Sequence, residues 1–123
     1  QKIIQAAKKI SSDKSLRLTI GNIEIIRDWG WAEEYVKAIH IITEAKQPLD
    51  QIICTGQAYS LKFFIEKVFS KFDLDWQKYI QIDKRLFRPS DILRSCGDPT
   101  KLYRDHLWRA NVNLEKIIDK MIE

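Results

Sequence analysis

The chain has 123 residues, of which 45% are hydrophobic and 31% are charged, and its formal net charge is +4. This length supports one hydrophobic core rather than two independent domains, and the composition excludes a disordered chain. No apolar run approaches the roughly 20 residues that cross a bilayer, and no secretory signal pattern opens the sequence. We therefore expect one soluble, cytoplasmic domain over residues 1–123.

The first predicted element is a helix over residues 2–10, where apolar residues already repeat at helical spacing. Because this pattern begins at once and residue 1 is not Met, we expect the sequence to be a piece of a longer protein. Residues 16–20 alternate apolar and polar side chains as a short strand does, and a turn is predicted at Gly21-Asn22. An aromatic and a glycine follow Arg27-Asp28, which predicts a loop position for Arg27.

A second helix is predicted over residues 31–45, with apolar side chains at spacings of three and four. Two glutamates fall in its first turn, where negative charge favours the helix dipole, and the helix is expected to stop before Pro48. Residues 51–55 form a short β-branched apolar run closed by Gly56, which predicts a buried strand.

The clearest helix is predicted to begin after Ser60 as its N-cap and to bury a face rich in phenylalanine over residues 61–72. A strand over 79–82 and an irregular stretch over 84–94 follow. Asp98-Pro99 predicts a helix whose first residue is the proline, and Asn113 is expected to cap the last helix. Short strands that alternate with helices predict an α/β or α+β class with a small sheet.

The basic balance of the chain is compatible with a phosphate-containing partner, because basic proteins gain affinity for phosphates by releasing counterions. Acidic residues are interspersed among the basic ones, so the sequence predicts no single basic face. A modest anionic ligand therefore fits better than nucleic acid. A basic interaction module stays open as an alternative, supported only by the aromatic content.

Several kinds of site are not predicted. The glycines at positions 21, 30, 56 and 97 are too dispersed for a dinucleotide-binding turn or a P-loop. Neither histidine has a Ser, Cys or second His at a suggestive spacing, so we predict no metal site and no catalytic triad. Cys54 and Cys96 lack zinc-ligand spacing and are expected to be free thiols.

Two arginines remain as candidate ligands for an anion. Arg27 precedes an aromatic and a glycine, and Arg88 precedes a proline that stiffens its backbone. A planar, permanently charged guanidinium suits bidentate binding of phosphate oxygens. The chain holds 21 Lys and Arg, however, and most arginines in loops are solvated surface groups.

Residues 21–36 read Gly-Asn-Ile-Glu-Ile-Ile-Arg-Asp-Trp-Gly-Trp-Ala-Glu-Glu-Tyr-Val. This segment resembles Gly-Asn-Leu-x-x-x-Arg-Asp-Trp-Gly-x-Ala-x-Asp-Tyr-Val of GDP-mannose 4,6-dehydratases. Later pieces follow in the family's order over residues 53–56, 87–91, 97–101 and 107–108, so the resemblance covers nearly the whole chain. It implies a small mixed α/β C-terminal substrate-binding domain of an extended short-chain dehydrogenase/reductase, without the Rossmann domain that binds NADP.

The resemblance also implies roles for individual residues. Arg27 and Arg88 match the family's arginines that clamp the diphosphate of the substrate. Asp91 stands where the family has Glu in Arg-Pro-x-Glu, a carboxylate that accepts hydrogen bonds from the ribose hydroxyls, and Asn22 is expected near the nucleotide. Asp28 is expected to fix a loop. Leu107 replaces a usual Gly, which implies a changed helix end.

In this family, C4 of mannose is oxidised by NADP, water is lost across C5 and C6, and hydride returns to C6. The product is GDP-4-keto-6-deoxymannose, and the family's Tyr-x-x-x-Lys pair lies in the N-terminal domain. No tyrosine of this chain has lysine at that spacing. We therefore expect the chain to bind GDP-mannose without catalysing the reaction, within a homo-oligomeric parent. The alternative is a part of another NAD(P)-dependent nucleotide-sugar epimerase, dehydratase or reductase.

Overall fold

The computed structural model describes residues 1–47 and 49–123, which form five α-helices and five short strands. The elements, in chain order, are α1 (Lys2–Ser12), β1 (Leu18–Ile20), β2 (Ile26–Asp28), α2 (Ala32–Thr43), β3 (Ala58–Ser60), α3 (Leu61–Ser70), η1 (Trp76–Lys78), β4 (Ile80–Ile82), η2 (Lys84–Leu86), β5 (Arg94–Ser95), α4 (Thr100–His106) and α5 (Leu114–Ile122). The predicted small mixed α/β class is confirmed.

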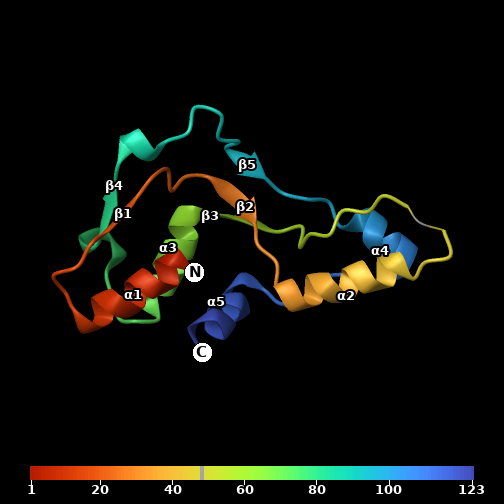
Figure 1. Cartoon of the computed structure of the whole chain (residues 1–123), viewed down its shortest axis with the longest axis horizontal. Coiled ribbons are helices and arrows are strands. Elements are labelled where there is room, and N and C mark those ends of the chain that lie inside the picture. The colour runs from red at the N-terminus through yellow and green to blue at the C-terminus, as the bar shows by residue number, and fades with distance from the viewer. Residues whose placement is uncertain (48) are drawn as a thin grey trace.

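The strands form two small sheets. Strands β1 and β4 pair in parallel, whereas β2 lies between β3 and β5, antiparallel to the first and parallel to the second. Figure 1 shows α1, α3 and α5 gathered at one end of the molecule and α2 and α4 at the other. The three-stranded sheet lies between these two groups, so residues on β2 occupy the middle of the chain's long dimension.

The main core lies among α1, α3 and α5 and is built from apolar faces with helical spacing. Helix α3 begins where the Ser60 Oγ accepts from the Phe63 N–H at 3.1 Å, which confirms the predicted N-cap. Buried residues from α1, β1, α3 and α5 meet in one cluster, among them Ile4, Ala7, Ile10, Leu18, Ile65, Val68, Phe69 and Ile118. A smaller set at the other end comprises Ala38, Cys54 and Leu102.

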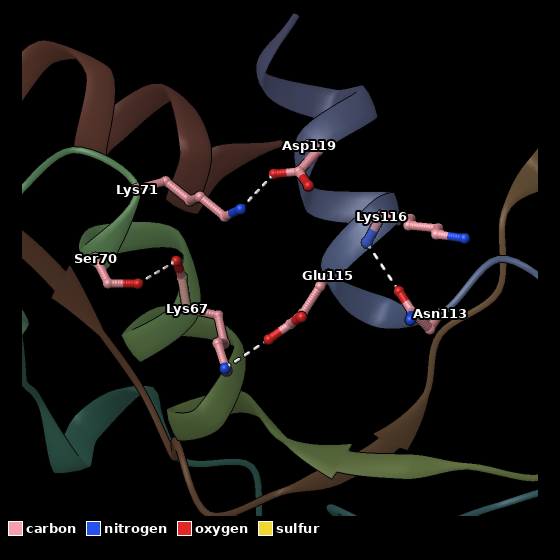
Figure 2. Close-up of polar contacts among 7 residues, drawn as sticks. All are labelled: Lys67, Ser70, Lys71, Asn113, Glu115, Lys116 and Asp119. Atoms are coloured by element: carbon pink, nitrogen blue, oxygen red, sulfur yellow. Dashed lines mark hydrogen bonds and ion pairs between the residues drawn. The ribbon is translucent and has the colours of Figure 1, made fainter.

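Ion pairs join α5 to α3 on the solvent side of the main core (Figure 2). The Lys67 Nζ lies 2.6 Å from Glu115 Oε1, and the Lys71 Nζ lies 2.7 Å from Asp119 Oδ1. Both partners recur at a spacing of four, so the pairs stack one turn apart along both helices. At the start of α5, Asn113 Oδ1 accepts from the Lys116 N–H at 3.0 Å, which confirms the predicted cap.

Two predictions about residues near the site are wrong. Arg27 lies in strand β2 and not in a loop, because it pairs with Tyr59 on β3 and Ser95 on β5, partners that are distant in sequence. Residues 51–55 form no strand, and the single N–H of Thr55 donates to the Asp28 carboxylate and not to a neighbouring strand.

Predicted helix ends also shift by small amounts. Helix α4 begins at Thr100 instead of Pro99, α3 ends at Ser70, and α2 runs from Ala32 to Thr43. The expected stop before Pro48 concerns a residue outside those that the structure describes. Helix termini depend on the last few backbone hydrogen bonds, which weak local signals do not fix.

Candidate functional site

Arg27 holds the central position of the three-stranded sheet. Its backbone lies between Tyr59 on β3 and Ser95 on β5, and its side chain is half-buried. The guanidinium Nη1 donates to the Ile26 carbonyl at 2.8 Å. No ion pair joins Arg27 to a carboxylate in the described part of the chain. Its charge is therefore free to meet an anion.

Arg88 and Asp91 share one exposed turn between η2 and β5. The Asp91 N–H donates to the Arg88 carbonyl at 3.1 Å, which closes a four-residue turn. The chain then enters β5, where the Ile26 N–H donates to the Leu93 carbonyl at 2.8 Å. The turn that carries Arg88 and Asp91 thus leads directly into the strand beside Arg27, although the structure places no direct hydrogen bond between the two arginines.

Asn22 lies just beyond β1, half-buried in a local turn. Its side-chain oxygen accepts from the Glu24 N–H at 2.9 Å, so the amide NH₂ group is left to face a partner. Its neighbour Gly21 lies against η2: a Cβ at Gly21 would stand 2.9 Å from the Leu86 carbonyl oxygen. Asn22 is therefore close in space to the segment that precedes Arg88.

Asp28 fixes the turn that precedes β3. Its Oδ1 accepts from the Thr55 hydroxyl at 2.5 Å and from the Thr55 N–H at 3.1 Å, and its Oδ2 accepts from the Gly56 N–H at 2.9 Å. This arrangement confirms the expected loop-fixing role of Asp28. The sequence pattern named the carboxylate but not its donors, because they lie 27 and 28 residues away.

Gly30 and Tyr35 pack closely at the start of α2. A Cβ at Gly30 would lie 2.1 Å from Tyr35 Cε1, so no side chain fits there without moving the ring. Burial, and then the charge of Asp28, raises the pKa of Tyr35 to about 12. The Tyr35 phenol is therefore protonated near neutral pH and packs edge-on against Trp108, with ring centroids 6.3 Å apart.

Glu34 ties the C-terminal segment to α2, a role that sequence patterns did not reveal. Its carboxylate accepts from the N–H groups of Asn111 at 2.9 Å and Val112 at 3.1 Å. The sequence signal at this position, an acidic residue in the first turn of a helix, indicated only a favourable interaction with the helix dipole. The structure shows that the carboxylate instead anchors a segment 77 residues away.

Two hollows in the surface are not lined by the predicted ligand residues. One of about 70 Å³ is bordered by Trp29, Thr55, Gln57, Tyr59 and residues 110–114. A larger one of about 610 Å³ is mainly apolar, with Trp29, Trp31, Phe64 and Met121 among its lining residues. Neither is lined by Arg27, Arg88, Asp91 or Asn22. The predicted ligand residues therefore border neither of these two hollows.

Two of the dispersed glycines are in close packing contacts: Gly30 contacts Tyr35, and a Cβ at Gly97 would stand 2.6 Å from the Cys54 sulfur. Among residues 1–47 and 49–123, no group of three or more His, Cys, Asp or Glu side chains could hold a metal ion. No helix in that same part is long and apolar enough to span a membrane.

Comparison with known proteins decides the family. A sequence model described as GDP-mannose 4,6 dehydratase matches residues 1–121. The chain belongs to the GDP-mannose 4,6 dehydratase family. Its sequence is 32% identical over 123 residues to GDP-mannose 4,6 dehydratase 1 of Arabidopsis thaliana, covering all of this chain and 34% of the relative. It is 25% identical over 139 residues to the GDP-mannose 4,6 dehydratase of Homo sapiens, covering 99% of this chain and 37% of the relative.

This member of the GDP-mannose 4,6 dehydratase family thus spans about a third of the length of these curated relatives. Solved structures confirm the fold. RMD from Pseudomonas aeruginosa, complexed with NADPH, superimposes with a TM-score of 0.80 at 19% identity, covering 98% of this chain and 40% of that one. A dTDP-glucose 4,6-dehydratase from Bacillus anthracis, in complex with NAD, gives 0.80 at 11% identity, covering 98% and 37%. These likenesses show that the chain adopts the fold of part of an extended short-chain dehydrogenase/reductase.

Proposed function

We propose that this chain supplies the nucleotide-sugar-binding part of a GDP-mannose 4,6-dehydratase, an NADP-dependent lyase that converts GDP-mannose to GDP-4-keto-6-deoxymannose. The family match over residues 1–121 supports this proposal. The observation that carries it is the parallel pairing of β5 with β2, which brings the turn of Arg88 and Asp91 alongside the strand of Arg27. The residues proposed for the diphosphate and the ribose would thereby lie on one strand of the sheet and on the turn that leads into the neighbouring strand.

In this proposal, Arg27 and Arg88 bind the diphosphate. Arg27 is half-buried and keeps guanidinium donors beyond the one used by the Ile26 carbonyl. Charge-assisted hydrogen bonds from two guanidinium groups would hold the diphosphate from two sides. The contribution to the reaction is positional, because a fixed diphosphate orients the sugar for chemistry elsewhere in the enzyme.

Asp91 and Asn22 complete the proposed nucleotide site. The exposed Asp91 carboxylate would accept from the ribose hydroxyls, and the Asn22 NH₂ group would donate to the nucleotide, since its oxygen is already bound to the Glu24 N–H. We assign NADP, which accepts and returns hydride in this chemistry, to the portion of the parent enzyme that the chain does not span. The catalytic Tyr-x-x-x-Lys pair is assigned to that same portion.

Titration calorimetry with GDP-mannose tests this proposal. We expect the wild-type chain to bind GDP-mannose and GDP in preference to UDP-glucose. Arg27→Ala or Arg88→Ala should weaken binding by about 10- to 100-fold, because a hydrogen bond to a charged group contributes about 1.5–3 kcal/mol. The matched control is Arg104→Ala, which removes the same charge from α4, where Arg104 pairs with Asp105.

Each outcome of the titration has a distinct meaning. Equal affinity for UDP-glucose would favour a related nucleotide-sugar epimerase, dehydratase or reductase as the parent. Unchanged affinity in both arginine variants would overturn the assignment of the diphosphate ligands. Equal weakening in Arg104→Ala would show that net charge alone drives binding.

A further inference from the structure

Asp28 is a half-buried carboxylate held entirely by hydrogen bonds. Both of its oxygens are used, by the Thr55 hydroxyl and by the N–H groups of Thr55 and Gly56, at 2.5–3.2 Å. No ion pair neutralises it in the described part of the molecule. Loss of this contact would leave the N–H groups of Thr55 and Gly56 without an acceptor, which is costly inside a protein. The contact therefore strongly constrains β2 relative to the turn at residues 55–57.

The turn that receives Asp28 is itself well ordered. The Thr55 hydroxyl oxygen accepts from the Gln57 N–H at 3.0 Å, which leaves the hydroxyl proton for the Asp28 carboxylate. Gly56 adopts a left-handed backbone with φ of 76°, and a Cβ there would lie 3.0 Å from the Pro99 ring. The turn therefore presents two N–H groups and one hydroxyl in fixed directions, and a carboxylate with two free acceptor oxygens matches them.

The sheet that holds Arg27 needs such a restraint. Strands β2 and β3 have three residues each and β5 has two, so few ladder hydrogen bonds fix their register. Strands of two or three residues are at or below the short end of the range found in globular proteins. Asp28 is the residue next to Arg27, and it joins the end of β2 to the turn that enters β3, directly beside the Arg27–Tyr59 pair.

From this geometry we propose that Asp28, acting through Thr55 and Gly56, is the positioning residue that holds Arg27 in its anion-binding orientation. The inference rests on the proposed function, since it takes Arg27 as the diphosphate ligand. It adds that the Asp of the Arg-Asp-Trp-Gly segment serves the substrate indirectly: it contacts the 55–57 turn and not the nucleotide sugar. The anion site at Arg27 would thereby be organised before its ligand arrives.

The variants for the test separate positioning from simple loss of stability. Asp28→Asn keeps the shape of the side chain but replaces one acceptor oxygen with an NH₂ group, which then faces N–H donors. Thr55→Val removes the hydroxyl, which donates to Asp28 and accepts from the Gln57 N–H, and Thr55→Ser restores it. The matched control is Asp13→Asn, because the Asp13 Oδ1 likewise accepts from a backbone N–H and a hydroxyl, those of Ser15, in a turn between α1 and β1.

Two measurements on each variant complete the experiment. The first is the solvent-exchange rate of the Arg27 guanidinium ¹⁵N–¹H signals by NMR, assigned from their absence in Arg27→Ala. The second is the affinity for GDP. We expect Asp28→Asn and Thr55→Val to speed guanidinium exchange and to weaken GDP binding by about tenfold or more. Thr55→Ser and Asp13→Asn should leave both quantities as in the wild type.

The two readouts distinguish failure of this inference from failure of the proposed function. An Arg27 signal that is unchanged in Asp28→Asn would overturn the positioning role, whatever the affinity for GDP. If exchange rises in Asp28→Asn and Thr55→Val but the wild type binds no GDP, the positioning role stands and the proposed function fails. Equal effects from Asp13→Asn would show a general loss of stability and would also overturn the inference.

Discussion

At the scale of single residues, the Arg-Asp-Trp-Gly segment contains the proposed diphosphate ligand and residues that fix the structure around it. Arg27 has a free charge, Asp28 holds the 55–57 turn, and Gly30 leaves room for the Tyr35 ring. The glycine is required by packing, because the ring occupies the volume where a side chain would stand.

Gly30→Ala should destabilise the chain for this reason. The new methyl group would lie 2.1 Å from Tyr35 Cε1 and Cζ, so the ring must leave its position against Trp108. Forced overpacking costs about 1–3 kcal/mol, which urea denaturation would detect as a lower midpoint with an unchanged slope. In a Tyr35→Ala background the same substitution should cost much less. An equal loss in both backgrounds would contradict the clash.

Leu107→Gly should have the opposite effect. Leu107 ends α4 with φ of 54° and ψ of 24°, the left-handed conformation in which glycine is favoured, and its side chain is 77% exposed. The helix end thus keeps a glycine-type geometry although the residue is leucine. We expect a gain of about 1 kcal/mol in the free energy of unfolding. Glu44→Gly, at the end of α2 with φ of −87°, is the control and should give no gain.

At the scale of elements, sequence patterns predicted the features that depend on contacts within a few residues along the chain. Ser60 and Asn113 cap their helices as expected, because a cap needs only a side chain and an N–H three residues away. The strand of Arg27 was missed because its strand partners, Tyr59 and Ser95, are distant in sequence, and local propensity does not encode such partners. The apolar run at 51–55 was misassigned because a carboxylate on β2 replaced the neighbouring strand.

The α3–α5 ion pairs make stability depend on pH in a defined direction. The hydrogen bond with Lys67 lowers the pKa of Glu115 from its ordinary 4.5. A depressed folded-state pKa contributes stability that is present above the unfolded value and is lost as pH falls through the folded one. Glu115→Gln should therefore lower the melting temperature near neutral pH and have little effect in acid below the folded pKa. Thermal melts across this range check it.

Lys67→Gln provides the matching half of this test. The hydrogen bond with Glu115 raises the pKa of Lys67 above 10.5. The contribution of Lys67 to the free energy of unfolding is therefore fully present below pH 10.5 and is lost as pH rises through the folded-state pKa. The double variant should lose no more than the Glu115→Gln variant near neutral pH, since both substitutions remove the same contact. Additive losses would show that the two side chains act independently.

At the scale of the whole molecule, the candidate site lies where two unequal packing regions meet. The main core unites α1, α3 and α5, whereas Ala38, Cys54 and Leu102 form a much smaller buried set beside α2 and α4 (Figure 1). The sequence predicted the mixed class and, by resemblance, Arg27, Arg88, Asp91 and Asn22. The supporting contacts of Asp28 and Glu34 were not predictable, because they depend on how distant segments meet.

This asymmetry predicts that the α2–α4 region opens before the main core unfolds, because local stability follows the amount of buried apolar contact. Cys54 reports on that opening: it is 5% exposed, and burial followed by the Asp28 charge raises the pKa of its thiol. In a Cys96→Ser background, the rate at which a thiol reagent modifies Cys54 gives the free energy of opening around that residue. We expect this value to be smaller than the opening free energy that amide hydrogen exchange gives for α3. Equal values would mean that both regions unfold as one cooperative unit. A Cys54→Ser variant, which retains the exposed Cys96, calibrates the reagent.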